Sequence, residues 1–139
     1  MMNPVIKILL FIIITVSFSC EDLEKYIVNC SECYINKPVS AVLEIQTNRS
    51  AGEVFISIYE GNLEDNIIYD SFSTISSNIS RSVPLYKTYT LTATYSYNGN
   101  LYTTVNSVVP RVKYVENQCE EPCYVVYSKV VDLKLKYTK

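Results

Sequence analysis

The stretch TYTLTATYSYNGNLYTTVNSVVP, residues 88–110, decides the fold of this chain. From Tyr89 to Tyr97, apolar or aromatic residues alternate with threonine and serine, which is the period of a strand with one buried face. Asn98-Gly99 follows, and a second run extends from Leu101 to Val109. Asn-Gly between two such runs predicts a β-hairpin, because a type I′ turn requires positive φ at both central residues. Pro110 then closes the second strand.

A two-residue turn also fixes the register of the hairpin. Counting outward from the turn pairs Tyr95 with Tyr102 and Ala93 with Thr104 on one face. The sequence therefore predicts which side chains of the two strands lie opposite one another.

Further strands are predicted on both sides of this hairpin. Alternating runs before it predict strands over residues 39–46, 54–59, 67–72 and 79–85, with a turn over 48–52. Pro84 marks the fourth of these as an edge strand or a bulge, since proline cannot donate to a ladder. After Pro110, we expect a polar loop that carries Cys119 and Cys123, and then one long final strand from Tyr124 to Tyr137.

These elements predict an all-β chain. About seven short strands with no convincing helix in the mature chain favour an antiparallel β-sandwich, immunoglobulin-like or transthyretin-like, over a barrel. The composition agrees, because the chain is rich in strand-forming residues and has 13 tyrosines. The chain has no tryptophan, so the usual immunoglobulin core marker is missing.

The N-terminus has the pattern of an export signal. Lys7 precedes an apolar run over residues 8–16, and Ser17-Phe18-Ser19-Cys20 follows it. The run is too short for a transmembrane helix, which needs about 20 apolar residues. We therefore expect a signal peptide over 1–19, an acidic tether over 20–37 and a β-sandwich domain over 38–139. A plain secretory signal remains the alternative.

Three segments together resemble a known group of proteins. Ser17 to Cys20, the acidic residues Glu21-Asp22-Leu23-Glu24, and the hairpin from Thr88 to Thr104 are similar to small β-sandwich lipoproteins of Bacteroidota. This resemblance implies that Cys20 carries the lipid and that the protein is anchored in the outer membrane, either periplasmic or surface-exposed. Most members of the group have no assigned activity, so the resemblance assigns no functional residue.

The remaining cysteines predict disulfides. Lipidation of Cys20 leaves Cys30, Cys33, Cys119 and Cys123, and four cysteines outside the cytoplasm usually pair. Bridges between the first two and the last two would fix the tether to the final strand, whereas bridges within each pair are the alternative. A four-cysteine zinc site and a redox-active pair are weaker alternatives.

Catalysis and cofactors are not expected. The chain has no histidine, which excludes Ser-His-Asp and Cys-His catalysis and histidine-ligated metals. Glu60, Glu64, Asp65 and Asp70 lie in or near one loop, where paired carboxylates or a calcium site are possible but solvated charges are the usual case. We expect no catalytic residue, no metal and no cofactor. A net charge of −2 also argues against a nucleic-acid partner.

The candidate ligand contacts are three tyrosines near the hairpin turn, Tyr95, Tyr97 and Tyr102. Exposed tyrosine rings stack on sugars or anchor protein interfaces, although a tyrosine in a strand often packs in the core instead. The sequence thus favours a lipid-anchored, non-enzymatic binding or accessory module of the cell envelope with a protein or glycan partner. A structural subunit of a surface fibre or adhesin, and a plain secreted binding protein, are the alternatives.

Overall fold

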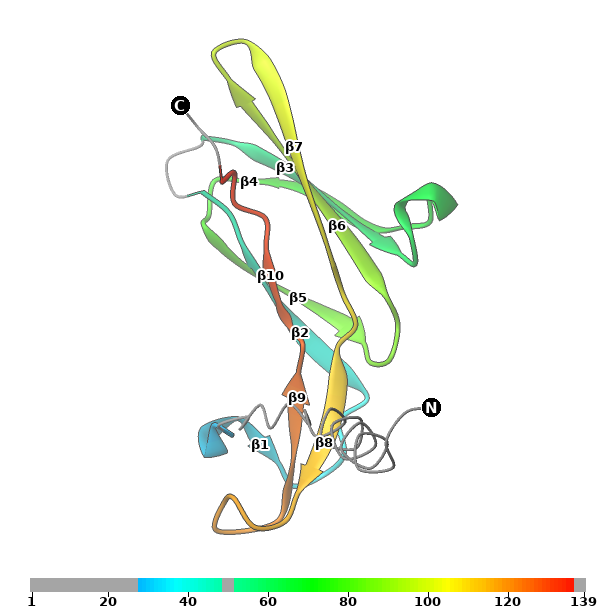
Figure 1. Ribbon diagram of the computed structural model, residues 1–139, viewed down its shortest axis with the longest axis vertical. Helices are drawn as coiled ribbons and strands as arrows, with labels where there is room; N and C mark the ends of the chain where they lie inside the picture. Colours follow the sequence, from blue (N-terminus) through cyan, green and yellow to red (C-terminus); the bar gives the residue numbers. More distant parts are fainter. Residues whose placement is uncertain (1–27, 49–51, 137–139) are drawn as a thin grey trace, which may run out of the picture.

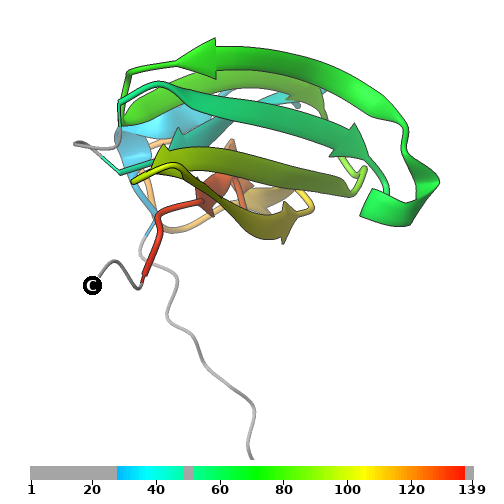
Figure 2. The same ribbon diagram turned by 90° about the horizontal axis from the view of Figure 1, so that it is seen from above.

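The computed structural model describes residues 28–48 and 52–136, which form an all-β fold of three sheets. The strands are β1 (Cys33–Tyr34), β2 (Ser40–Gln46), β3 (Val54–Glu60), β4 (Ile68–Thr74), β5 (Asn78–Pro84), β6 (Tyr89–Tyr97), β7 (Asn100–Val108), β8 (Arg111–Val115), β9 (Cys123–Tyr127) and β10 (Val130–Asp132). There are also two short 3-10 turns: η1 (Cys30–Glu32) precedes β1, and η2 (Leu63–Asp65) lies between β3 and β4 and projects beyond them (Figures 1 and 2).

The two larger sheets form a β-sandwich. One has the strand order β4-β3-β6-β7, and the other has the order β10-β2-β5. In β2 and β5, buried and exposed residues alternate as the sequence predicts. In β6 the alternation predicted from the sequence is not seen, because Thr90 and Thr92 are buried together with Tyr89, Leu91 and Ala93. Each of the two sheets still presents an apolar face to the other. The core between them contains Leu43, Ile45, Val54, Ile56, Ile58, Ile79, Val83, Tyr89, Leu91, Ala93, Tyr95, Val108, Val131 and Leu133.

The predicted hairpin is confirmed. Asn98 and Gly99 have φ values of 50° and 77°, the positive values that a type I′ turn requires. Tyr95 pairs with Tyr102 and Ala93 with Thr104, in the predicted register. The hairpin turn lies at one end of the long axis of the molecule (Figure 1).

A third, smaller sheet lies at the opposite end of the molecule and has the order β1-β9-β8 (Figure 1). We call it the disulfide-linked sheet, because one bridge joins β1 to β9 and a second joins η1 to the loop before β9. Cys30 is bonded to Cys119 and Cys33 to Cys123, each with a Cα–Cα distance of 5.6 Å. The predicted disulfides are therefore confirmed, and of the two connectivities that the sequence left open the structure has the bridges between the first two cysteines and the last two.

Three stretches of chain join the disulfide-linked sheet to the sandwich: residues 35–39 lead from β1 into β2, and the other two leave the β8–β9 pair. β7 leads into β8 through Pro110, and β9 leads into β10 through Ser128 and Lys129 (Figure 1). β8 and β9 pair with each other, but β7 and β10 belong to different sheets of the sandwich. The β8–β9 ribbon thus forks, and one arm enters each layer.

Two sequence predictions for this region are wrong. The residues after Pro110 form strand β8 and not only a polar loop, because Val112 and Val115 turn inward while Arg111 and Lys113 stay exposed. The long final strand is also broken. Ser128 has a φ of 53°, and β10 after it pairs with β2 in parallel, so the antiparallel pattern has this one exception among the described strands. Tyr137 lies outside the described residues.

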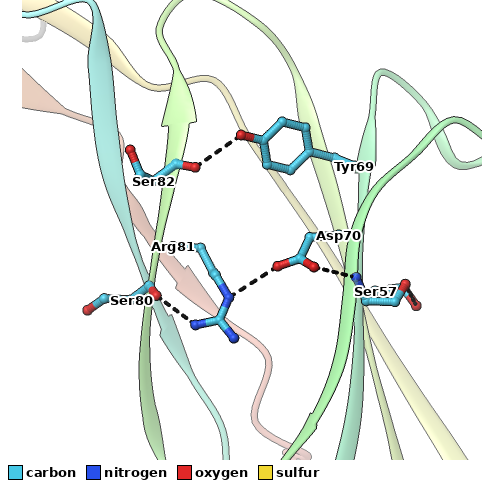
Figure 3. A network of polar contacts seen from close by, with 7 residues as sticks. Ser57, Tyr69, Asp70, Ser80, Arg81 and Ser82 are labelled. Carbon is cyan, nitrogen blue, oxygen red and sulfur yellow. Dashed lines mark hydrogen bonds and ion pairs between the residues drawn. The ribbon is translucent and has the colours of Figure 1, made fainter.

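Charged and aromatic side chains close the side of the sandwich where β4 and β5 meet (Figure 3). Arg81 Nε of β5 lies 3.1 Å from Asp70 Oδ2 of β4, and the Arg81 guanidinium stacks 3.8 Å from the centre of the Phe72 ring. Tyr69 Oη donates to the Ser82 carbonyl oxygen at 3.1 Å. Pro84 ends β5, an edge strand as predicted.

Lys129 stands at the fork. Its Nζ lies 2.8 Å from Glu32 Oε2 in η1 and 2.7 Å from Glu44 Oε1 in β2, while its carbonyl oxygen accepts from the Glu44 N–H. Partial burial by itself lowers the pKa of Lys129, but the hydrogen bonds to the two carboxylates outweigh it and raise the pKa above its ordinary value. Lys129 therefore links the disulfide-linked sheet to the sandwich.

Candidate functional site

A groove follows β7 on the side of the sandwich opposite to the Arg81–Asp70 pair. It has a volume of about 560 Å³, and its far wall is the chain that continues from β10, which runs beside β7 (Figure 2). Its lining residues are Tyr102, Thr103, Thr104, Val105, Asn106, Asp132, Lys134, Leu135 and Lys136. Five consecutive residues of one strand line it, so the groove runs along the edge of the sheet and not over a single face.

Hydrogen bonds from β6 and β7 hold the far wall in place. Tyr95 Oη and Thr104 Oγ1 both donate to the Leu133 carbonyl oxygen, at 2.7 and 2.8 Å. Asn106 Nδ2 donates to the Asp132 carbonyl oxygen at 3.1 Å. These bonds occupy carbonyl oxygens at the end of the short strand β10 and just beyond it, and they fix its continuation next to β7.

The three predicted tyrosines have different environments. Tyr95 is only 1% exposed and bonded to Leu133, so its ring belongs to the core and does not contact a ligand from solvent. Burial accordingly raises the pKa of Tyr95, because the ionised form would lose its hydration. Tyr97 and Tyr102 are 47% and 44% exposed, and Tyr102 lines the groove. The spacing of these tyrosines in the sequence does not distinguish a ring in the core of the sandwich from an exposed ring near the turn.

The four cysteines form a second cluster, at the other end of the molecule. Their sulfurs lie close together: those of Cys33, Cys119 and Cys123 are all within 4.8 Å of one another. Both disulfides use these sulfurs, so none is a free thiolate that could bind a metal or attack a substrate. The structure therefore places these residues in crosslinks.

The loop carboxylates do not converge on one site. Glu60 Oε1 accepts from Lys87 Nζ at 2.8 Å, and Asp70 pairs with Arg81. Asp65 Oδ2 accepts the N–H of Asn62 and so stabilises the turn at η2. The turn geometry and the ion pairs account for these three side chains.

Sequence reasoning missed the far wall of the groove. The sequence pattern places Lys134 and Lys136 in a strand of the sandwich, but they lie after β10 and line the groove. The Lys134 ammonium donates to Gln46 Oε1 of β2 at 3.0 Å. The alternation of the two lysines with Leu133 and Leu135 is visible in the sequence, but the break at Ser128 that redirects the segment is not.

Cys20, the predicted lipid attachment site, lies outside the described residues. Within the described part of the chain, no helix has the length and apolar character needed to cross a membrane. Two disulfides are typical of proteins that fold in an oxidising compartment outside the cytoplasm. No family model matches this chain, and neither a curated protein nor a solved structure shows significant similarity to it.

Proposed function

We propose that the protein is a non-enzymatic binding module of the cell envelope, anchored to the outer membrane by lipid on Cys20, that binds a partner protein along strand β7. The observation that supports this proposal is the groove beside β7, because it follows a sheet edge of nine residues. A sheet edge offers a row of backbone donors and acceptors, and an extended polypeptide is the ligand that matches them.

The shape of the molecule is consistent with this role. The disulfides lie at the end opposite to the hairpin turn, and they fix the C-terminal part of the predicted tether, which contains Cys30 and Cys33 (Figure 1). A tether at that end would hold the hairpin and the upper part of β7 away from the membrane surface. The exposed rings of Tyr97 and Tyr102 would then be available to a partner.

A protein partner fits this site better than a glycan. Sugar recognition needs aromatic rings open to solvent, and Tyr102 is the one aromatic residue among those that line the groove, because Tyr95 is buried in the core. The groove instead presents backbone along β7 together with Asn106, Lys134 and Lys136, which suit the main chain and the polar side chains of a peptide.

The test is site-specific photo-crosslinking in cells that express the full chain. A photoreactive phenylalanine analogue replaces Tyr102, and in a matched control it replaces Tyr114, which is similarly exposed on β8. We expect a discrete protein adduct from position 102 and none from position 114. The absence of an adduct at 102, or equal adducts at both positions, would refute binding at β7.

The anchor is tested separately by changing Cys20 to Ser. We expect the variant to leave the membrane fraction, because without a lipid the chain has no acyl anchor. The control is Cys33→Ser, which removes a described bridge and leaves the predicted lipid site intact. Continued membrane association of the Cys20 variant would rule out the lipoprotein assignment.

A further inference from the structure

The free edge of β7 differs from the other sheet edges that the structure describes. Each of the three sheets has two edge strands, and natural proteins protect such edges with charges, proline, bulges or short length. The other five edge strands show these features. β4 has Asp70 and a register shift in its ladder with β3, β5 has Arg81 and Pro84, and β8 has Arg111 and Lys113. β10 is three residues long and contains Asp132, and β1 is two residues long.

β7 has none of these four features, although the chain after β10 lies against the side chains of Thr104 and Asn106. Its nine residues, NLYTTVNSV, contain no charge and no proline, and the ladder with β6 continues without a shift from Tyr89–Val108 to Tyr97–Asn100. Leu101 and Val105 are 74% and 53% exposed on this strand. A long, regular, uncharged edge with exposed apolar side chains is the kind of edge on which another strand adds.

The hairpin register shows which backbone groups are available. In a two-residue hairpin the pair next to the turn, Tyr97 and Asn100, is hydrogen-bonded, and bonded pairs then recur at every second residue. Residues 101, 103, 105 and 107 therefore direct their N–H and C=O groups away from β6. Consistent with this, the Ser107 N–H donates to Asn106 Oδ1 at 2.8 Å, a bond that an added strand would replace.

We propose that the strand that adds to β7 is β7 of a second copy of this chain, antiparallel across a two-fold axis at Thr104. This inference rests on the proposed function, since it names the partner at the same edge. In this pairing, residue 103 of one copy lies opposite residue 105 of the other, and residue 101 lies opposite residue 107. All four residues whose backbone groups point away from β6 therefore pair with residues of the second copy. The two four-stranded sheets become one sheet of eight strands.

Side-chain chemistry favours a second copy. In this register Leu101 and Val105 of one copy are diagonal neighbours of Val105 of the other, so the exposed apolar side chains cover one another. The strand itself has no charge, so the β7 side chains of two copies do not repel each other, and the nearest charged residues, Asp132, Lys134 and Lys136, lie on the far wall of the groove. The interface is also isologous and closes after two chains. A fibre would instead need β7 to pair with a different edge, and the other described edges carry the protection described above.

The first test uses a cysteine on the two-fold axis. Thr104 of each copy would face Thr104 of the other in a non-hydrogen-bonded pair with a Cα–Cα distance of about 4.5 Å, within the range that a disulfide spans. In cells that express the full chain, Thr104→Cys should give a disulfide-linked species of twice the chain mass on a non-reducing gel. The matched control, Ser73→Cys, puts a cysteine on β4, the other edge of the same sheet, and should remain a single chain.

The second test changes the charge of the edge. Processed full-length protein extracted in detergent should be dimeric by light scattering. Val105→Lys should weaken dimerisation at least about tenfold, because the two introduced ammonium groups, one from each copy, would lie near each other across the axis. Ser73→Lys, with the same added charge on β4, should leave the dimer intact. Circular dichroism of both variants checks that the fold is retained.

Three results would overturn the inference: a monomeric wild type, equal crosslinking of the Thr104 and Ser73 variants, or an open series of larger species. The photo-crosslinking experiment at position 102 distinguishes failure of the dimer proposal from failure of the proposed function. An adduct with a different protein, together with a monomeric wild type, would keep the binding edge and reject the second copy. The absence of any adduct would reject both.

Discussion

The sandwich and the disulfide-linked sheet are stabilised by different forces. In the sandwich, two sheets bury a shared core that includes two large tyrosine side chains, Tyr89 and Tyr95. The disulfide-linked sheet has one layer, and its contact with the sandwich is a small cluster of Ala41, Leu85 and Val126 with Val112 packed against it. It has instead two covalent bridges and the ion pairs of Lys129.

This difference shows where a small all-β chain needs crosslinks. A single three-stranded layer removes too little apolar surface from water to compensate for the entropy of ordering its strands. A disulfide lowers that cost by restricting the unfolded chain. The bridges therefore occur at the end of the molecule where the core is thin, and no described cysteine lies in the sandwich.

The largest expected effect comes from removing both bridges. They close nearly the same loop, with sequence separations of 89 and 90 residues, so once one has formed the other closes only a short additional ring. Chain-entropy estimates then give about 2 kcal/mol for loss of one bridge and about 4 kcal/mol more for loss of the second. Urea unfolding of Cys33→Ser/Cys123→Ser and of the variant with all four cysteines changed measures both steps. Two equal steps would show that the bridges stabilise the fold independently.

The next effect compares the two apolar clusters directly. Leu91→Ala in the centre of the sandwich should lower the free energy of unfolding by about 3 kcal/mol, because the cavity lies between two sheets that cannot collapse onto it. Val112→Ala in the small cluster should cost about 1 kcal/mol, since this side chain is only partly buried. Both variants keep the disulfides and are measured by chemical denaturation. Equal losses would mean that burial contributes as much at the disulfide-linked end as in the sandwich.

The smallest effect concerns the link between the two regions. Lys129→Gln should lower the free energy of unfolding by about 1 kcal/mol, because both carboxylate partners are close to half exposed and water screens the pairs. The folded state raises the pKa of Lys129, so its contribution is complete below its ordinary pKa and is lost only as the pH rises beyond that value. The difference between wild type and variant should therefore be constant from about pH 7 to about pH 9, below the ordinary pKa of lysine. A difference that falls within this range would contradict the assignment of the pairing to the protonated lysine.

The sandwich was largely predictable from the sequence, and the disulfide-linked end was not. In the hairpin, the alternation and Asn98-Gly99 determine strands, turn and register locally, so the prediction needs no distant information. The course of the chain after Pro110 depends on tertiary contacts. β8 exists because β9 returns beside it, and β10 leaves that ribbon because Ser128 adopts a positive φ and β2 accepts the next residues.

The candidate site was only partly predictable for the same reason. Tyr97 and Tyr102 are exposed near the turn, whereas Tyr95 is buried and bonded to Leu133, a residue 38 positions away, and the sequence pattern does not separate these environments. That β7 is an edge strand follows from the order of the sheet, which the sequence pattern does not give. The lack of charge in residues 100–108 is readable in the sequence, but it acquires meaning only once the strand is known to be an edge.

The positions of the two bridges also determine what a protease can achieve. Every peptide bond between Cys33 and Cys119, which includes the whole of β2 to β8, lies inside the loop that the bridges close. Cleavage of any one of these peptide bonds, for example in the projecting η2 turn, leaves two pieces. The N-terminal piece, with Cys30 and Cys33, stays bonded to the C-terminal piece, with Cys119 and Cys123. A nicked molecule would therefore stay in one piece, and both halves of the sandwich would remain attached to whatever holds the N-terminus.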